Sequence, residues 1–284
     1  MRVSSGTPRV SICIPVFNCE RFLREAICSA LGQTYSQFEL IILDNASTDG
    51  TAEVLADFDD PRITVHRNET NIEAAGNWNR AVKRASGEYI KLLCADDVLE
   101  PECLARQIAA LDAAPSASLC SCRRTIVDEE GAAQMTRGWG GADRVVSSAE
   151  ALREIVRTGT NLLGDPSAVL FRRDASVRAG EFRAEAGYAI DLDLWIRLLE
   201  VGDVAVIVAP LTRYRVSASS WSVSVDSSQA ADAIAVLETA AALPGSTASS
   251  TDLRLGVARA RLNQVLRWVF YKVVFSFKST ARKA

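Results

Sequence analysis

Apolar strand-like segments alternate with amphipathic helical segments over residues 9–115, and this alternation most limits the folds open to the chain. The strand-like runs are Val10–Pro15, Phe38–Leu43, Ile63–Arg67 and Tyr89–Cys94. Continuous apolar runs are typical of strands buried on both faces of a parallel sheet. Segments with apolar residues every three or four positions lie between them and predict helices. Strands and helices joined by short connections indicate a doubly wound α/β fold.

Aspartates follow the second and fourth of these strand-like runs: Asp44 after one, Asp96 and Asp97 after the other. Ligands of open α/β sheets bind outside the carboxyl ends of the strands. Two adjacent carboxylates repel each other there, and a divalent cation shared with an anionic ligand would stabilise them. The alternative is that Asp96 and Asp97 only open a turn and cap the next helix.

The second half of the chain adds fewer regular elements. Ser118–Val127 and Val204–Pro210 predict strands, and the glycine-rich Met135–Gly141 predicts a mobile loop. Asn161–Arg172 reads as a turn that runs into a strand. Asp191 opens a helix whose first turn holds two acidic residues.

The composition changes near residue 225, where we expect a domain boundary. The chain from residue 253 onward carries eight basic and no acidic residues, mixed with aromatic ones. One interpretation is a helix that packs its aromatic face on the rest of the protein. The other is an interfacial helix at an anionic membrane.

The inventory of residues excludes several classes of protein. The net charge of −3 gives no reason to expect a nucleic-acid partner. The single histidine, His66, argues against a Ser-His-Asp hydrolase and a histidine-rich zinc site. Neither a P-loop nor a dinucleotide fingerprint is present. Seven cysteines without a C-x-x-C pair, no secretory h-region and no apolar run of ~18–20 residues predict a cytoplasmic location.

Four motifs together resemble the family-2 glycosyltransferases, which have the GT-A fold. They occur in the order of that family and are Val10–Asn18, Phe38–Thr51, Asn71–Pro101 and Ala189–Arg197. The resemblance implies a Rossmann-like, mostly parallel twisted sheet flanked by helices, with a C-terminal helical extension. It divides the chain into a catalytic domain, residues 1–225, and a helical tail, residues 226–284. The nucleotide-binding half would span residues 9–115 and the acceptor-binding half residues 116–225.

The resemblance also implies an activity. Family members transfer a sugar from a nucleotide-sugar, usually with inversion and with a divalent metal, here Mn²⁺ or Mg²⁺. We expect a UDP- or dTDP-sugar donor and a hydroxyl acceptor on a glycan or a lipid-linked glycan, in cell-surface polysaccharide biosynthesis. A lipid-linked acceptor fits an enzyme held at the inner face of the plasma membrane through residues 257–284.

Site residues follow from the same motifs. The metal ligands would be Asp97 and Asp96, with Asp96 also at the ribose. Asp44 would accept a hydrogen bond from the base, and an acceptor-only carboxylate suits the imide N–H of uracil or thymine. The resemblance implies that the nucleotide contacts are Pro15, Phe17, Asn18, Asp44, Asn71, Asn79 and Asp96.

Asp191 falls at the position of the family's catalytic base, where a carboxylate can take the proton of the attacking hydroxyl. Its alternative role is an N-cap of the helix through Trp195. Acceptor or diphosphate contacts are expected from Asp165, Trp195, Arg213 and Arg215. The segment around Asp165 could equally be an ordinary turn.

The chain departs from the family pattern at several positions. Cys94 and Ser217 stand where an acidic residue and a histidine are frequent, and Glu73 and Ala81 replace usual glycines. These departures leave open a nucleotide-binding protein that has lost catalysis. A nucleotidyltransferase would carry a glycine- and lysine-rich phosphate loop near the N-terminus, which Val16–Arg24 lacks.

Overall fold

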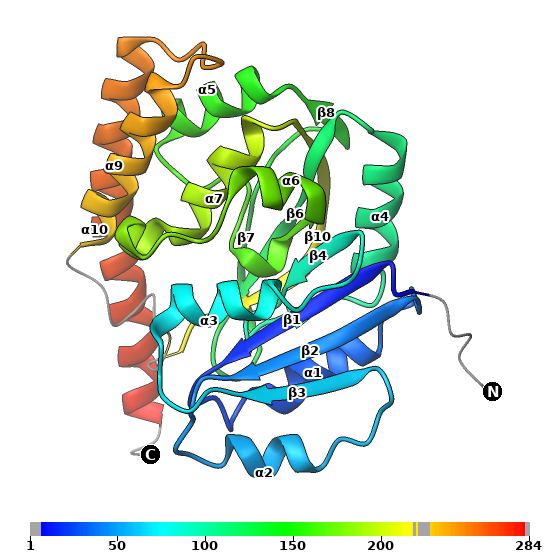
Figure 1. Ribbon diagram of the computed structural model, residues 1–284. Helices are drawn as coiled ribbons and strands as arrows, with labels where there is room; N and C mark the ends of the chain where they lie inside the picture. The colour runs from blue at the N-terminus through cyan, green and yellow to red at the C-terminus, as the bar shows by residue number, and fades with distance from the viewer. Residues whose placement is uncertain (1–6, 218–219, 221–227, 282–284) are drawn as a thin grey trace.

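A computed structural model describes residues 7–217, 220 and 228–281, with side chains as far as Val269. The expected domain boundary near residue 225 lies outside the described residues. A central sheet carries helices on both faces, and two C-terminal helices run side by side along one side of the molecule (Figure 1).

The sheet has ten strands, and eight of them follow the order β3-β2-β1-β4-β9-β6-β10-β5. The strands are β1 (Val10–Val16), β2 (Phe38–Asp44), β3 (Ile63–Arg67), β4 (Tyr89–Leu92), β5 (Val98–Leu99), β6 (Ala117–Val127), β7 (Ala133–Arg137), β8 (Arg144–Val146), β9 (Val169–Arg172) and β10 (Asp203–Arg215). The predicted parallel sheet is confirmed for β1 to β4, where each neighbouring pair is parallel. Strand β9 then pairs antiparallel with both β4 and β6 and joins the two halves.

Helices fill the connections. They are α1 (Leu23–Leu31), α2 (Thr51–Ala56), α3 (Glu73–Val82), α4 (Cys103–Ala113), α5 (Ser148–Thr158), α6 (Arg173–Ala179), α7 (Ile190–Leu199), α9 (Gln229–Ala242) and α10 (Ser250–Ala281), with 3₁₀ turns at Pro166–Ala168 (η1) and Ala184–Ala189 (η2). The Ser147 hydroxyl accepts a hydrogen bond from the backbone N–H of Glu150 and caps α5.

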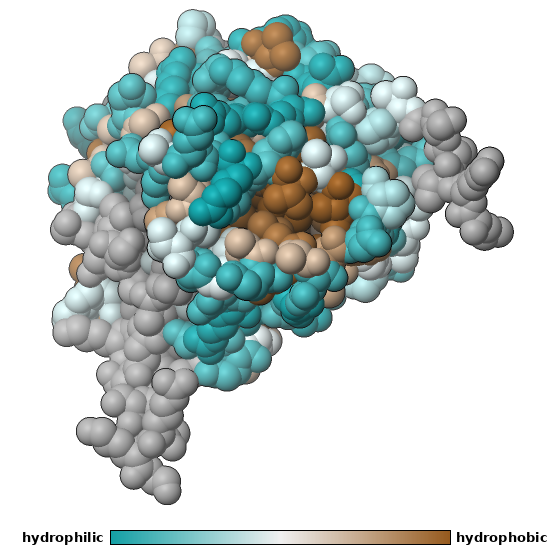
Figure 2. All heavy atoms as spheres, turned by 60° about the horizontal axis from the view of Figure 1, so that its bottom comes forward, coloured by the Kyte–Doolittle hydropathy of each residue, from teal (hydrophilic) through white to brown (hydrophobic). Residues whose placement is uncertain are grey.

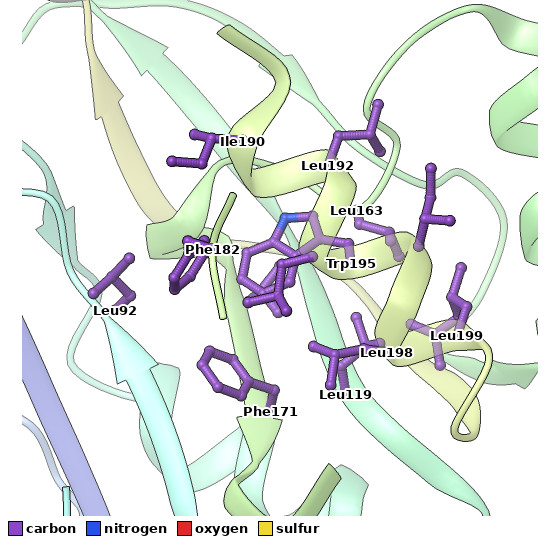
Figure 3. Close-up of a cluster of buried hydrophobic side chains, with 14 of the residues drawn as sticks. Leu92, Leu119, Leu163, Phe171, Phe182, Ile190, Leu192, Trp195, Leu198 and Leu199 are labelled. Carbon is purple, nitrogen blue, oxygen red and sulfur yellow. The ribbon is translucent and has the colours of Figure 1, made fainter. Parts of the chain in front are cut away.

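Two apolar cores lie on opposite faces of the sheet. One joins the sheet to α1 and α4, and the other joins it to α3, α5 and α7. The indole of Trp195 on α7 lies at the centre of the second core, between the rings of Phe171 and Phe182 (Figure 3). Aromatic contacts of this kind add to the free energy gained by burial.

The prediction of a mobile loop at Met135–Gly141 is wrong for the first residues of that segment. Residues 133–137 form β7, which pairs antiparallel with β6. All five residues of β7 are exposed, so the strand has no apolar pattern that would predict it. It forms because its backbone pairs with the long strand β6. At the opposite end of the sheet, strand β3 is largely exposed. The view of the lower face of the molecule shows an apolar patch among polar residues (Figure 2).

The C-terminal helix packs closely on α5. At Gly256 of α10, an added Cβ would lie 1.8 Å from the carbonyl oxygen of Val156. A Cβ on Gly159, the left-handed C-cap of α5, would lie 2.1 Å from the carbonyl oxygen of Gly256. Glycine is therefore required at both positions of this crossing. None of the helices in the described part of the chain is both long enough and apolar enough to cross a membrane.

Candidate active site

The parallel strands β1 and β2 deliver the first site residues to their carboxyl ends. Asp44 closes β2 opposite Val16, and its carboxylate is 1% exposed. It accepts a hydrogen bond from the backbone N–H of Ser47 at 2.9 Å and forms an ion pair with Arg67. These two partners hold the carboxylate in one orientation at the strand end.

The loops beside Asp44 contain three non-glycine residues with positive φ: Asn18 (48°), Ala46 (62°) and Glu73 (59°). Left-handed backbone costs roughly 1–3 kcal/mol at such residues and is held by the surrounding structure. All three follow or precede elements at one edge of the sheet. Glu73 stands at a position where the family usually has a glycine, and it adopts the left-handed backbone conformation that glycine favours.

A buried network of asparagines supports this edge. The amide of Asn45 donates to Asn71 at 2.8 Å, and its oxygen accepts from Asn68 at 2.8 Å. Asn68 also donates to Asn77, whose amide reaches the carbonyl of Leu43 at 3.2 Å. The network ties the end of β2 to the start of α3.

Asp96 and Asp97 follow β4, and the structure gives them different surroundings. Asp97 is 1% exposed; one oxygen accepts from the Ser167 hydroxyl at 2.5 Å and the other from the Arg215 backbone N–H at 3.0 Å. Asp96 is half-buried, and among the described residues its side chain makes one long contact, 3.5 Å, with the Ser220 hydroxyl. Asp97 is thus anchored by two shorter hydrogen bonds, whereas Asp96 is held less tightly by the described part of the chain.

Burial acts on both carboxyl groups. Loss of solvent raises the pKa of Asp96 to about 6, and it raises the pKa of Asp97 well above its usual value with help from the Asp96 charge. The negative charge of Asp165 adds to both shifts. A pair of this kind is stabilised in its ionised form by a bound cation.

Asp191 at the start of α7 forms the second carboxylate site. Its Oδ2 accepts from the side-chain amide of Asn161 at 3.0 Å, and its Oδ1 accepts from the backbone N–H of Leu192 at 2.7 Å. The pKa of Asp191 is raised to about 7, mainly by burial; the hydrogen bond from Leu192 and the charge of Arg124 oppose this shift, and the charge of Asp165 contributes to it. A carboxyl with a pKa near neutrality suits proton transfer.

The charge of Asp165 acts on the carboxyl groups of both sites. Asp165 pairs with Arg124, with 2.8 Å between Nε and Oδ2, although the angle is poor for a hydrogen bond and both Asp165 oxygens lack a well-aligned donor. Burial raises the pKa of Asp165. Its charge acts on Asp96, Asp97 and Asp191, so the structure brings three separate segments of sequence into one acidic region.

The acidic region can be tested for its fit to a divalent cation. Within residues 7–217, 220 and 228–269, no group of three or more His, Cys, Asp or Glu side chains is arranged to hold a metal ion. Among the described residues, Asp96 makes one long contact and lies next to the anchored Asp97. Two carboxylates supply only part of the oxygen shell of a divalent cation, so other molecules would have to supply the remaining ligands.

Comparison with known proteins identifies the family. Residues 11–178, which include β1 to β4 and both Asp96 and Asp97, match Glycosyl transferase family 2. The chain belongs to this family. The glycosyltransferase is 32% identical to EpsE of Bacillus subtilis (strain 168) over 212 residues, which cover 70% of this chain and 69% of EpsE.

A second relative is named for its reaction. WfgD of Escherichia coli, a UDP-Glc:alpha-D-GlcNAc-diphosphoundecaprenol beta-1,3-glucosyltransferase, is 39% identical over 102 residues, or 36% of this chain and 40% of WfgD. Other matches cover 63–64% of their relatives, so the glycosyltransferase aligns with roughly two thirds of the length of several relatives.

Solved structures confirm the GT-A fold. TarS residues 1–349 of S. aureus in complex with UDP-GlcNAc has a TM-score of 0.66 at 20% identity, over 82% of this chain and 65% of that one. The mannosyltransferase PcManGT of Pyrobaculum calidifontis, in complex with GDP-Man and Mn²⁺, has a TM-score of 0.63 at 18% identity, over 99% and 77%. The α/β prediction with a C-terminal helical extension is thereby confirmed.

The residues expected at the nucleotide fall into two groups. Phe17 is 46% exposed, Asn18 and Asn71 are exposed, and Pro15 is buried at the end of β1 beside them. These residues surround the edge where Asp44 lies. Asn79 instead exchanges two hydrogen bonds of 2.8 Å with the backbone of Phe182, so its amide joins α3 to the segment before α7.

Three residues expected at the acceptor or diphosphate have structural partners. Trp195 is 0% exposed, so the predicted direct contact between its side chain and an acceptor is wrong. Its indole N–H instead donates to the carbonyl of Gly164 at 3.0 Å and supports the segment around Gly164. Arg213 pairs with Glu100 at 2.7 Å. The side chain of Arg215 is 3% exposed; it forms an ion pair with Glu25 and donates a hydrogen bond to the backbone carbonyl of Asp96. These contacts link β10 to the segment of the acidic pair.

Sequence reasoning missed Asn161 and Arg124 as candidate site residues, and it included Ser167 only within the segment around Asp165 where acceptor contacts were expected. Asn161 and Ser167 lie in the segment interpreted as a turn, and only the fold shows that it reaches both carboxylate sites. Arg124 had a signal: it is one of two adjacent arginines inside the strand-like run Ser118–Val127. A charge inside a buried strand needs a partner, which here is Asp165.

Proposed function

We propose that this glycosyltransferase inverts the configuration of the sugar that it moves from a UDP- or dTDP-sugar to a hydroxyl of a glycan or lipid-linked acceptor, in cell-surface polysaccharide biosynthesis. The observation that carries this proposal is the position of the Asp191 carboxylate, which two hydrogen bonds orient at the start of α7 and whose pKa burial raises to about 7, in the same acidic region as Asp96 and Asp97. One base and one leaving-group site are what a single displacement requires.

The reaction follows from these positions. The acceptor hydroxyl oxygen attacks the anomeric carbon, and its proton passes to the Asp191 carboxylate. The bond from the anomeric carbon to the diphosphate oxygen breaks, and the nucleoside diphosphate leaves. A single in-line displacement inverts the anomeric centre.

Asp96 and Asp97 would hold Mn²⁺ or Mg²⁺, which when bound neutralises the charge that develops on the leaving diphosphate. The hydrogen bonds from Ser167 and the Arg215 backbone hold Asp97 in place for this role. The Mn²⁺ in PcManGT supports the proposal by analogy of fold.

Asp44 supports a uracil or thymine base. It is fixed by Ser47 and Arg67 at the end of β2, and each carboxylate oxygen has acceptor capacity beyond these contacts. An acceptor suits the imide N–H of these two bases. The UDP-sugars in the names of WfgD and the TarS complex agree with this choice.

A calorimetric and thermal-shift titration with UDP, dTDP, GDP and CMP, each with and without Mn²⁺, tests the nucleotide site. We expect Mn²⁺-dependent binding of UDP or dTDP, weakened at least about tenfold in Asp97→Asn because one charged ligand is lost. Asp174→Asn is the matched control, since Asp174 lies on α6 with 76% of its side chain exposed. Binding of none of the four nucleotides by wild-type protein would contradict the proposal.

The tail supports a location at the inner face of the plasma membrane. Along α10, six large apolar side chains are 39–56% exposed: Leu255, Leu262, Val265, Leu266, Trp268 and Val269. Arg254 and Arg261 are exposed beside them. An apolar row flanked by cations is the pattern of a helix that lies on an anionic surface.

We expect wild-type protein to co-sediment with phosphatidylglycerol vesicles more than with phosphatidylcholine vesicles. The double variant Leu262→Glu/Leu266→Glu should lower the partition coefficient at least about tenfold, since two apolar contacts are lost and two negative charges are added. Val177→Glu is the matched control, because Val177 is 76% exposed on α6. Equal sedimentation of all three proteins would exclude the tail as the membrane contact.

A further inference from the structure

The side chain of Asn161 connects the segment before η1 to the carboxylate of Asp191 through hydrogen bonds. Its Oδ1 accepts a hydrogen bond from the backbone N–H of Gly164 at 2.9 Å. Its Nδ2 donates to the carbonyl of Gly164 at 2.9 Å and to Oδ2 of Asp191 at 3.0 Å. Because the Gly164 N–H can only donate, the amide of Asn161 has one orientation, with its N–H groups toward Asp191.

The turn that carries Asn161 is itself held rigidly. Gly164 has a φ of +107°, and a Cβ there would lie 2.7 Å from the Cβ of Ala168. Its carbonyl also accepts from the indole of Trp195 at 3.0 Å. The hydroxyl of Ser121 on β6 donates to the neighbouring carbonyl of Leu163 at 2.6 Å. The Nδ2 of Asn161 is therefore a fixed donor rather than a mobile surface group.

Asp191 receives one hydrogen bond on each oxygen, from Leu192 on its own helix and from Asn161 on the opposite segment. Two donors on opposite sides prevent rotation of the carboxylate, and each oxygen keeps acceptor capacity for a substrate hydroxyl. The charged groups that act on Asp191 from neighbouring segments are Asp165 and Arg124. Within the described part of the chain, neither Asp165 nor Arg124 forms a hydrogen bond with Asp191 that would fix the carboxylate in place of Asn161.

We propose that Asn161 is a positioning residue that orients the Asp191 carboxylate toward the acceptor hydroxyl and favours its ionised form. This inference rests on the proposed role of Asp191 as the base. A donor fixed at 3.0 Å stabilises the carboxylate over the carboxylic acid. It also keeps the accepting oxygen within the narrow range of geometry that efficient proton transfer needs.

Asn161→Ser separates this role from a structural one. A serine hydroxyl can still accept from the Gly164 N–H and preserve the turn, but it is too short to donate to Asp191. We expect kcat to fall about 10–100-fold with the KM for the donor nearly unchanged. The acidic limb of the pH profile of kcat/KM should move up by roughly one unit, because the ionised base has lost a donor.

Ser121→Ala is the matched control. It removes another buried hydrogen bond to the same segment without a contact to Asp191. We expect it to lower the melting temperature and to leave the acidic limb where it is in wild-type protein. If Asn161→Ser gives the same pH profile as Ser121→Ala, Asn161 only holds the turn and the inference is wrong.

The titration of the Asp191 carboxyl, followed by NMR of ¹³C-labelled aspartate and assigned with Asp191→Asn, gives a readout that needs no turnover. A higher pKa in Asn161→Ser than in wild-type protein supports the inference, and an unchanged pKa overturns it. Failure of the proposed function would look different: wild-type protein would transfer no sugar, while the NMR titration would still report on the contact between Asn161 and Asp191.

Discussion

Asp191→Asn should lower kcat about 10²–10⁴-fold, the usual contribution of a general base. The amide can no longer take the proton of the acceptor hydroxyl, although it fills the same space at the start of α7. Affinity for the nucleoside diphosphate should stay within about twofold, since the groups expected at the diphosphate, Asp96 and Asp97, are untouched. Steady-state transfer assays together with UDP titration separate the two effects.

The pH dependence of wild-type activity follows from the same residue. A base must be ionised to act, and the pKa of Asp191 is raised to about 7 by burial. The kcat/KM should therefore rise with pH through about 7 and be lost progressively below it. A profile that stays flat down to pH 5 would exclude Asp191 as the base.

Stability has the opposite dependence on pH at this residue. The folded pKa of Asp191, about 7, lies above its usual value of 3.8. The folded state therefore holds a proton that the unfolded state has released between about pH 4 and 7, and its stability falls as pH rises through this window. Asp191→Asn removes that loss, so its melting temperature at pH 8 should be no lower than that of wild-type protein. A large fall would mean that the lost activity reflects a damaged fold.

Gly256→Ala should destabilise the protein by about 3 kcal/mol, although alanine is the better helix former by roughly 1 kcal/mol. The added methyl carbon would lie 1.8 Å from the carbonyl oxygen of Val156, so α10 must move away from α5. The movement would strain the ion pair between Arg153 and Asp252 and the hydrogen bond from Arg259 to the carbonyl of Arg157.

Thermal unfolding measures this effect, and we expect the melting temperature to fall by about 5–10 °C. Gly245→Ala is the matched control, because a Cβ at Gly245 has no atom within 4 Å. The sign of the change decides the question. A more stable Gly256→Ala variant would show that helix propensity outweighs the contact and that α10 does not pack on α5 this closely.

A displaced α10 would also affect the segment that leads into Asp191, the proposed base. Arg267 of α10 donates to the Tyr188 hydroxyl at 3.3 Å, and Asp232 of α9 accepts from the Tyr188 backbone N–H at 3.0 Å. Tyr188 lies in η2, which leads directly into Asp191 at the start of α7. The C-terminal helices therefore support the segment that leads into Asp191, and α10 also exposes a row of apolar side chains.

The local sequence determined the elements whose patterns are self-contained. The short, largely apolar runs at β1, β2 and β4 predict strands buried on both faces, because their length and β-branched residues are typical of strands rather than of buried helices. The position of aspartates directly after two of these strands then requires them to lie at one edge, since parallel strands share their carboxyl ends. That reasoning located Asp44, Asp96 and Asp97 without a structure.

Only the tertiary structure decided what the second half contributes. Strand β7 has no apolar pattern and exists because β6 offers unpaired backbone groups, while β9 runs antiparallel to join the halves. Trp195 could be a surface contact or a core residue from its sequence alone, and burial between Phe171 and Phe182 makes it a core residue. The bond between Asn161 and Asp191 spans 30 residues of sequence, and hydrogen bonds between distant segments leave no periodic signal in the chain. The sequence thus placed these carboxylates at the ends of strands and at the start of a helix, and the packing of distant segments determined which groups hold them and how burial shifts their pKa.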